Sequence, residues 1–352
     1  MLTGVRWPSC DGIPPAVYDA GVPSTLRRVM VTGASGFLGG HVVRTLASQG
    51  VSVVAQGRNA SRLVFDGNVR VCRCALSDVA TLSAAARGCD AIVHSAALSA
   101  PWGARQDFID ANVIGTANVI AAARAGGVSR LVHISSPAVI FDGNDQVLVD
   151  DSAPVPARLG SDYARTKRAA EALVGAVAGE FQTVILRPKA IYGAGDNALV
   201  PRLVRAARRG TLPQIGDGAN AVDVTHVDDV VRAIECALLA ERGLGDTFLI
   251  SGGEHVPLWT MIRALLAGIG VPSPARTISL GTALVAAGVM EAVAAVTRRE
   301  PTLTRYSARI LARTQTYDIS RARDILGYQP RVTSADGLAR TIDAMRAAPD
   351  VA

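Results

Sequence analysis

The sequence predicts an α/β protein, a doubly wound parallel sheet followed by a smaller C-terminal lobe. From Val29 onward, short runs of β-branched residues alternate with longer helical stretches. A glycine-rich turn follows the first of these runs, and after about residue 190 the alternation changes and strands become sparse. Strands that alternate with helices imply right-handed crossovers, which build a parallel sheet covered by helices on both faces.

The individual elements follow from hydrophobic periodicity and from the residues that end it. We expect strands at Val29–Thr32, Val51–Ala55, Val69–Cys74, Ala91–Ser95, Leu131–Ser135, Thr183–Arg187 and Thr247–Ser251. We expect helices at Phe37–Gln49, Asp78–Arg87, Gln106–Ala125, Tyr163–Glu180, Pro201–Arg209, Val227–Glu241 and Leu258–Gly268. Gly50 and Gly127 follow two of these helices, where a left-handed residue is favoured.

One long apolar segment, Ile278–Val296, has two interpretations. It is either a core helix of the C-terminal lobe or, together with Trp102, the roof of an apolar pocket. Glu291 and small residues interrupt a segment that is already at the short limit for a membrane span, which disfavours a span. Contact with a membrane surface stays open.

The composition limits the classes of partner. The net charge is +6, and the 36 basic residues include only two lysines, Lys167 and Lys189. The arginines are scattered rather than clustered among aromatic residues, so we expect no nucleic-acid partner. The five cysteines lack metal-ligand or redox spacing, so we expect no metal and reduced thiols in a cytoplasmic protein, with peripheral membrane contact as an option.

The glycine-rich turn has the form expected of a dinucleotide site. Gly33-Ala34-Ser35-Gly36-Phe37-Leu38-Gly39 lies between a predicted strand and a predicted helix. Gly33 permits a tight turn, Gly36 lets the backbone approach a pyrophosphate, and Gly39 allows the helix to pack closely on the strand. The alternative is a purely structural turn. We favour a Rossmann-type cofactor site, because the helix N-terminus there also offers N–H groups and a positive dipole end.

The end of the second strand favours NADP(H), with NAD(H) as the alternative. A carboxylate at this point would accept hydrogen bonds from the ribose 2′-hydroxyl, whereas a 2′-phosphate requires a guanidinium. The chain has Gly57-Arg58 there, with no acid to repel a phosphate. Arg58 could also be an ordinary surface arginine.

A tyrosine and a lysine four residues apart suggest acid–base catalysis. Tyr163 and Lys167 share one face of a predicted helix. A positive charge about 4 Å from the phenol, at an effective dielectric of about 20, is worth roughly 4 kcal/mol, or about three pK units. We therefore expect Lys167 to lower the pKa of Tyr163 from about 10 toward neutrality. A serine at the end of the fifth strand, Ser135 or Ser136, could hold the reacting oxygen. The alternative is that Tyr163 and Lys167 are an exposed i,i+4 pair on a helix with no catalytic role.

These residues, in this order, resemble the extended short-chain dehydrogenases from Val29 to about Met345. Further matches are His94-Ser95-Ala96-Ala97, Asn112-Val113-Ile114-Gly115, Leu186-Arg187-Pro188 with Ile191-Tyr192-Gly193, and Leu326-Gly327-Tyr328. Pro101-Trp102-Gly103 and Ser136-Pro137 are most similar to the 3β-hydroxysteroid dehydrogenase branch, which includes sterol dehydrogenases and bacterial 2-alkyl-3-oxoalkanoate reductases.

The resemblance implies roles for individual positions. It implies Ser136, Tyr163 and Lys167 as catalytic residues, with Lys167 also holding the nicotinamide ribose, and Asn112 as a supporting residue. It implies cofactor contacts from Gly33, Ser35, Gly36, Phe37, Leu38, Gly39, Arg58, Leu76, Ala96, Ala97, Tyr163, Lys167, Pro188 and Ile191. One departure is Ala75-Leu76, where the family usually has an Asp-Leu pair whose aspartate contacts adenine.

The expected activity is the interconversion of a ketone and a secondary alcohol on a large lipophilic substrate, of the 3β-hydroxysteroid or 2-alkyl-3-oxo acid type. The alternatives are a nucleotide-sugar epimerase or dehydratase of the same superfamily and a non-catalytic cofactor-binding protein. Similar proteins often form homodimers through helices of this kind. We expect a leader at 1–28, a dinucleotide-binding domain at 29–190, a substrate lobe at 191–345 partly interleaved with the sheet domain, and a tail at 346–352.

Overall fold

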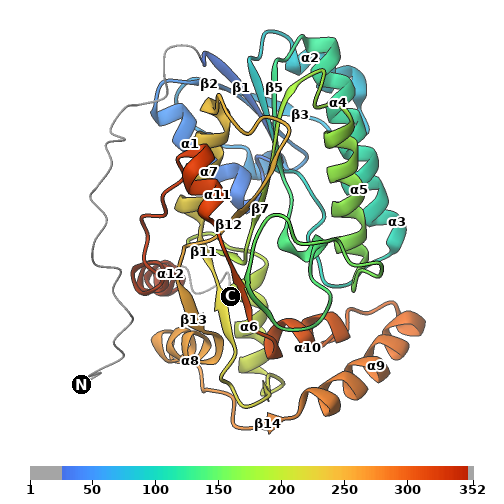
Figure 1. Cartoon of the computed structure of the whole chain (residues 1–352), viewed down its shortest axis with the longest axis vertical. Coiled ribbons are helices and arrows are strands. Elements are labelled where there is room, and N and C mark those ends of the chain that lie inside the picture. Colours follow the sequence, from blue (N-terminus) through green and yellow to red (C-terminus); the bar gives the residue numbers. More distant parts are fainter. Residues whose placement is uncertain (1–25, 348–352) are drawn as a thin grey trace.

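The computed structural model describes residues 26–347. Most of the leader predicted for 1–28 and most of the tail predicted for 346–352 therefore lie outside the described residues. The described chain forms a sheet flanked by helices, with a smaller lobe below it in the view of Figure 1.

The central sheet is entirely parallel and has seven strands in the order β12-β7-β5-β4-β1-β2-β3. Its strands are β1 (Arg28–Thr32), β2 (Ser52–Gly57), β3 (Val69–Arg73), β4 (Ala91–His94), β5 (Arg130–Ile134), β7 (Gln182–Pro188) and β12 (Thr247–Ile250). Strands buried on both faces are rich in Val, Ile and Leu, as these are. The predicted strands and the α/β class are confirmed, and β12 comes from the second half of the chain.

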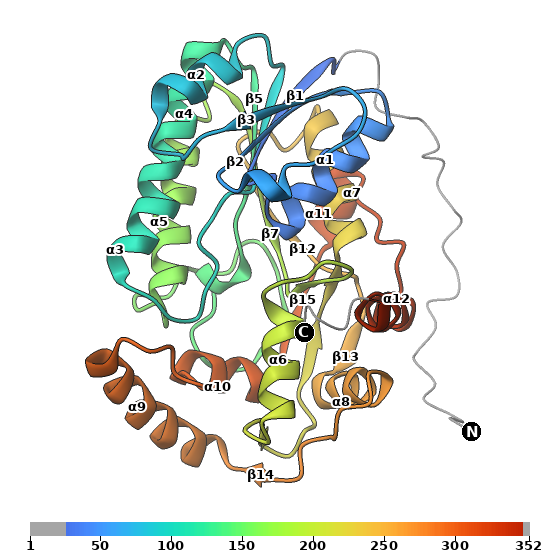
Figure 2. The same ribbon diagram turned by 180° about the vertical axis from the view of Figure 1, so that it is seen from behind.

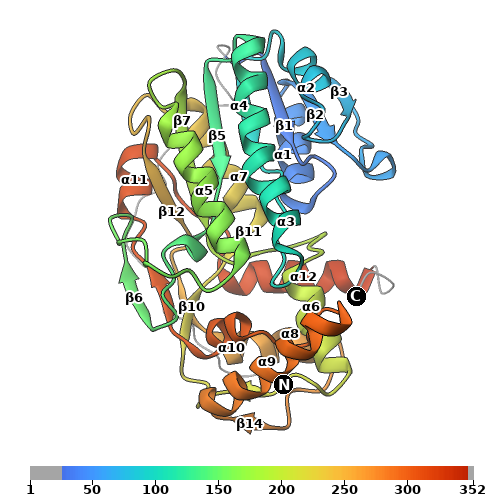
Figure 3. The same cartoon turned by 90° about the vertical axis from the view of Figure 1, so that its right-hand side faces the viewer.

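Helices cover both faces of this sheet (Figures 1 and 3). On one face lie α1 (Phe37–Ser48), α7 (Val227–Leu239) and α11 (Ser320–Leu326). On the other lie α2 (Val79–Ala86), α4 (Gly115–Gly126) and α5 (Asp162–Ala176). Gly127 ends α4 with a φ of 69°, the left-handed conformation expected of it.

The helix predicted for Gln106–Ala125 is divided into three parts. A short helix, α3 (Arg105–Phe108), leads into a π-helical segment at Ile109–Ile114, and α4 follows. The widened turn contains Asn112, whose side chain bonds to neighbouring segments rather than to solvent. Such π-helical turns often occur at functional sites.

The lobe is built mainly from the second half of the chain around a separate apolar core. Its helices are α6 (Leu199–Arg208), α8 (Leu258–Gly268), α9 (Leu280–Thr297), α10 (Arg305–Ala312) and α12 (Ser334–Ala347). A four-stranded sheet, β13-β10-β15-β6, joins β13 (His255–Pro257), β10 (Ala221–Asp223), β15 (Gln315–Tyr317) and β6 (Gln146–Val149). Two short pairs complete it: β8 (Ile191–Tyr192) with β11 (Thr225–His226), and β9 (Gln214–Ile215) with β14 (Thr277–Ile278).

The apolar segment for which two interpretations were open is α9, and the first of them, a core helix, is wrong. Within residues 26–347 it is the one helix long and apolar enough to cross a membrane, with a mean hydropathy of 1.7, yet only 17% of it is buried. Figure 2 shows it at the outer edge of the lobe beside α10. Only small residues, Ala283, Ala287 and Ala294, are buried along it, because α10 covers a single narrow face.

Candidate active site

The predicted site residues follow six neighbouring strands at the same edge of the sheet. They lie after β1 (Gly33, Ser35, Gly36, then Phe37, Leu38 and Gly39 in α1), β2 (Arg58), β3 (Leu76), β4 (Ala96, Ala97), β5 (Ser136) and at or after β7 (Pro188, Ile191). Tyr163 and Lys167 come from the first turns of α5. The carboxyl edge of a parallel sheet is where such folds bind ligands.

The glycine turn has little room for any side chain. Gly33 has a φ of +72°, and a Cβ there would lie 2.7 Å from the Ala96 Cα. A Cβ on Gly39 would lie 2.7 Å from the carbonyl carbon of Gly33 and closer still to its oxygen. The turn and the helix therefore pack backbone against backbone, which only glycine allows at both positions.

Gln56 holds the glycine turn in place through hydrogen bonds, a role that sequence reasoning missed. Its side-chain oxygen accepts a hydrogen bond from the Gly33 N–H at 3.1 Å, and its amide nitrogen donates to the Cys74 carbonyl at 2.7 Å. Its own carbonyl accepts from the Ala34 N–H at 2.8 Å. A glutamine inside an otherwise apolar strand was the available signal.

The residues around the turn fit a dinucleotide. No side chain caps the start of α1 at Gly36, so its N–H groups face outward, whereas Asp78 caps α2 and Ser161 caps α5. A Cβ on Gly57 would lie 2.8 Å from the Ser35 hydroxyl oxygen, so an acid at this position would displace Ser35. Arg58, the next residue, is exposed.

Segments beyond the turn complete the expected adenine side of the site. Asn118 donates to the Leu76 carbonyl at 2.9 Å, which holds the segment after β3 against α4. The Leu76 side chain packs against Gly115. A Cβ added to Gly115 would lie 2.7 Å from the Leu76 Cδ1 atom. Ala97 is exposed at the end of β4.

The phenol of Tyr163 lies among hydroxyl groups. The Ser161 side chain caps α5 by accepting from the Ala164 N–H at 3.1 Å, which begins the helix just before Tyr163. Hydrogen bonding from Ser136 and Ser99 lowers the pKa of Tyr163, but burial, the larger effect, raises it above its ordinary value. Sequence reasoning missed Ser99, which follows the matched His94–Ala97 segment.

The prediction that Lys167 lowers the pKa of Tyr163 is wrong for this structure. The Lys167 ammonium donates to the Ile134 carbonyl at 2.5 Å and lies 3.5 Å from His133 Nε2, and it is not among the groups that shift the Tyr163 pKa. Burial lowers the pKa of Lys167 itself to about 8. Tyr163 therefore carries its proton at neutral pH, the form that a proton donor requires.

The two adjacent serines have different surroundings. Ser135 donates to the buried carboxylate of Glu171 at 2.6 Å, and Arg187 binds both oxygens of Glu171 at 2.8 Å. Ser136 is half-buried and interacts with Tyr163. Ser135 is thus occupied by Glu171, and the catalytic role that the resemblance implies for Ser136 stays a prediction.

Asn112 connects two parts of the site. Its amide donates to the Leu98 carbonyl at 3.1 Å and to the Thr166 hydroxyl at 3.0 Å, and its oxygen accepts from the Leu98 N–H at 2.7 Å. The π-helical turn therefore ties the segment that carries Ser99 to the helix that carries Tyr163 and Lys167. Its role in support of catalysis stays a prediction.

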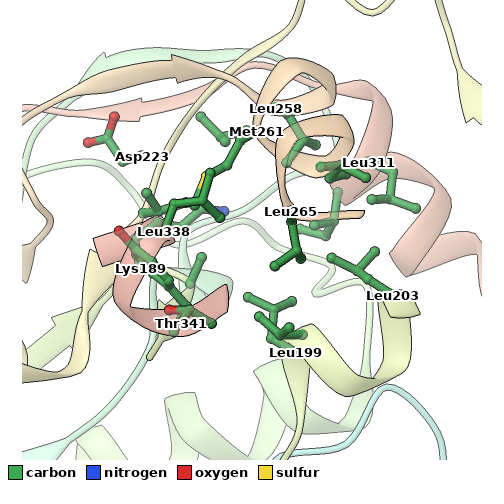
Figure 4. A pocket seen from close by; sticks show the side chains of 17 residues that line it. Lys189, Leu199, Leu203, Asp223, Leu258, Met261, Leu265, Leu311, Leu338 and Thr341 are labelled. Atoms are coloured by element: carbon green, nitrogen blue, oxygen red, sulfur yellow. The ribbon is translucent and has the colours of Figure 1, made fainter. Parts of the chain in front are cut away.

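A cavity of about 100 Å³ opens in the lobe (Figure 4). Its walls are mostly aliphatic side chains from α6, α8, α10 and α12, and Lys189 and Asp223 lie together on one side. Neither Trp102 nor any residue of α9 lines it, so the predicted roof is not found over this cavity. The reason is that α10, not α9, packs over the cavity, through Ile310 and Leu311.

Two tyrosines of the lobe, Tyr306 and Tyr317, form an electrostatic chain with Tyr163. Tyr306 lies one turn before Ile310 on the same face of α10. The charge state of Tyr163 affects the pKa of Tyr306, and Tyr306 in turn affects Tyr317, so the three phenols are electrostatic neighbours. Sequence reasoning gave Tyr306 no role, since nothing local to it marks it.

Comparisons with known proteins agree with this geometry. The model of the NAD dependent epimerase/dehydratase family matches residues 29–251. The chain is 37% identical over 322 residues to 2-alkyl-3-oxoalkanoate reductase of Stenotrophomonas maltophilia, covering 89% of this chain and 98% of the relative. It is 32% identical over 340 residues to the sterol-4-alpha-carboxylate 3-dehydrogenase (decarboxylating) of Homo sapiens, covering 91% and 88%.

Solved structures give the same result for the fold. MoeE5 in complex with UDP-glucose and NAD superimposes with a TM-score of 0.72 at 28% identity, covering 92% of this chain and all of the other. These two curated relatives are named as a reductase and a dehydrogenase, and the described residues fit a dinucleotide. The chain therefore belongs to the NAD dependent epimerase/dehydratase family of extended short-chain dehydrogenases, and it is an oxidoreductase.

Proposed function

We propose that this oxidoreductase reduces a ketone on a large lipophilic substrate to a secondary alcohol, with NADPH as the preferred reductant. The observation that carries the proposal is the placement of Tyr163 beside Ser136 at the cofactor edge, together with an aliphatic cavity in the lobe. The substrate class is a 2-alkyl-3-oxo acid or a sterol-like ketone, as the names of the two curated relatives suggest.

The chain's own residues handle the proton. Ser136 donates a hydrogen bond to the carbonyl oxygen and orients it, and Tyr163 gives its phenolic proton to the same oxygen. A bound nicotinamide supplies the hydride to the carbonyl carbon. Solvent then returns a proton to Tyr163, so the carbonyl gains one hydride and one proton in total. Lys167 would hold the ribose of the nicotinamide half.

The choice of NADPH rests on the end of β2. Arg58 is exposed beside Gly57, and Ser35 occupies the space that an acid at position 57 would need. A guanidinium and a hydroxyl suit a 2′-phosphate, whereas an acid would repel it. NADH is the alternative reductant, since NAD is the cofactor named with the solved neighbours.

A nucleotide-sugar activity is the competing function, because one solved neighbour holds UDP-glucose. The aliphatic walls of the cavity argue against a sugar, which would need several polar partners. The test is NADPH and NADH oxidation with steroid ketones, 2-alkyl-3-oxo acids and nucleotide sugars. Turnover of nucleotide sugars alone would refute the proposal.

The catalytic assignment has its own control. Tyr163→Phe is expected to lower kcat by about 10²- to 10⁴-fold while NADPH binding is retained. Tyr328→Phe removes another buried phenol, one that donates to the Ser251 carbonyl at 2.9 Å outside the site, and should keep near-normal kcat. A Tyr163→Phe variant with wild-type turnover would exclude this proton route.

We also propose that α9 contacts an anionic lipid surface. Val285, Val289, Val293 and Val296 form one stripe along the helix, with exposed fractions of 71%, 61%, 55% and 85%. Arg298 and Arg299 follow directly and are exposed. An apolar stripe next to cations is suited to anionic lipid, and the one acid of the helix, Glu291, is occupied by Arg305 at 2.6 Å.

Vesicle co-sedimentation tests this contact. Wild-type protein should bind phosphatidylglycerol vesicles better than phosphatidylcholine vesicles. A Val289→Ser/Val293→Ser double variant should bind at least about tenfold more weakly, since two valines lose their burial in the lipid. Val147→Ser, an equally exposed valine on β6, is the matched control. If the wild-type protein does not bind vesicles but self-associates, and the double variant does not self-associate, the valine stripe contacts a second copy of the chain instead.

A further inference from the structure

Lys189 is a buried cation that the proposed reaction does not use. It follows β7 directly, within the Pro188–Ile191 segment expected beside the nicotinamide, and it is only 9% exposed. It is one of two lysines in a chain whose other basic residues are arginine. Figure 4 shows it on one side of the cavity, with Leu199, Leu203 and Leu265 among the side chains around the space.

The ammonium group has no anionic partner among the described residues. Its Nζ donates to the neutral side-chain oxygen of Gln315 at 2.6 Å and lies 5.9 Å from the centre of the Tyr317 ring. No ion pair involves it within residues 26–347. An ammonium has three N–H donors, so this arrangement leaves donor capacity for a ligand.

The nearest acid is already engaged. Asp223 also lines the cavity, but its carboxylate accepts from the Tyr317 N–H at 3.1 Å and pairs with His255 Nδ1 at 2.6 Å. It acts on Lys189 only as a more distant charge, and burial lowers the pKa of Lys189 to about 8. Lys189 is thus charged at neutral pH, in surroundings that disfavour an unpaired charge.

Gln315 holds the ammonium in place. The Gln315 amide donates to the Ile310 carbonyl at 3.1 Å and the Arg313 carbonyl at 3.3 Å, which directs its oxygen toward Lys189. Tyr317 donates to Gln146 at 3.0 Å. The head of Lys189 is therefore positioned by two side chains of β15, one of which is bonded to β6, as a binding group needs to be.

Most of the remaining cavity wall is aliphatic, which defines the ligand further. A single fixed cation among leucine, valine and isoleucine side chains suits a molecule with one acidic group and a hydrocarbon part. The ammonium lies 5.9 Å from the centre of the Tyr317 ring, and both Tyr317 and Tyr163 are electrostatic neighbours of Tyr306.

We propose that Lys189 is the counter-ion for the carboxylate of the substrate, so that the enzyme acts on lipophilic acids in preference to neutral ketones or alcohols of the same shape. This rests on the proposed oxidoreductase function and narrows its substrate class. Lys189 would be a specificity residue that binds the acid group, apart from the proton transfer by Tyr163.

The test compares an acid with its ester in the oxidation direction, where the substrate is stable. The probes are 2-butyl-3-hydroxyoctanoic acid and its methyl ester, with NADP⁺ and the full chain. Wild-type kcat/KM should favour the acid by about 30-fold or more, the effect expected of a buried charge pair. Lys189→Met should bring the acid-to-ester ratio close to one, mainly through KM, and Lys189→Arg should retain part of the preference.

Calorimetric titration of the same acid into wild type and Lys189→Met gives a second readout that does not depend on turnover. Lys189→Gln serves if the methionine variant does not fold. An unchanged acid-to-ester ratio in the folded variants, or no preference for the acid in wild type, would overturn the role of Lys189. Failure of wild type to oxidise either probe or any lipophilic alcohol would instead refute the proposed function.

Discussion

Replacing Gly39 by alanine tests the packing of the glycine turn on α1. The added Cβ would lie 2.7 Å from the carbonyl carbon of Gly33, whereas ordinary contact begins at 3.4 Å. The turn must therefore move by about 0.7 Å or more, and both contact atoms are backbone. Overpacking of this kind costs about 1–3 kcal/mol, partly offset by up to about 1 kcal/mol of helix propensity gained over glycine. We expect a net loss of about 1–2 kcal/mol in the free energy of unfolding.

The consequence for the cofactor should be larger, because the displaced atoms belong to the turn that faces the pyrophosphate. A misplacement of about 1 Å can cost on the order of 10²-fold in function, so NADPH affinity should fall at least about tenfold. Urea denaturation and calorimetric titration measure the two effects. The matched control is Gly40→Ala, whose Cβ would lie 3.4 Å from the Ala34 oxygen and should stabilise the helix. Wild-type NADPH affinity in Gly39→Ala would refute the assignment of the turn.

Three other predictions concern charged groups. Arg58→Gln should raise KM for NADPH by about 10- to 100-fold and leave KM for NADH nearly unchanged, since a charge-assisted hydrogen bond contributes about 1.5–3 kcal/mol. Equal effects on the KM values of both cofactors would contradict the contact of Arg58 with the 2′-phosphate. Lys189→Met should raise the free energy of unfolding at pH 7 by about 3 kcal/mol, because the folded pKa is about 8 and the ordinary one 10.5. That advantage should shrink from pH 8 to 10.5, where the unfolded wild-type chain binds more protons than the folded one; an advantage independent of pH would contradict it. Glu171→Ala should lower the free energy of unfolding by about 3–5 kcal/mol, because it leaves Arg187 buried and unpaired. Urea denaturation measures this loss, and a loss below about 1 kcal/mol would show that water replaces the carboxylate.

Local signals determined the order of elements and the glycine turn. The strands of the sheet and the helix after Gly36 follow from periodicity over a few residues, and Gly33 needs a positive φ whatever surrounds it. Tyr163 and Lys167 share a helix face for the same reason. The sequence alone therefore predicted the fold class and the family, and it predicted which residues gather at the carboxyl edge of the sheet.

Only the tertiary structure decided what these residues touch. Lys167 bonds to the Ile134 carbonyl because β5 passes beside α5, and that contact joins positions 33 residues apart. Ser99 and Tyr306 approach Tyr163 from other parts of the chain. The exposure of α9 and the isolation of Lys189 in an aliphatic cavity depend on which neighbours cover a side chain. Burial and charge pairing arise from packing between distant segments, and hydrophobic periodicity records only that a face is apolar, not what lies against it.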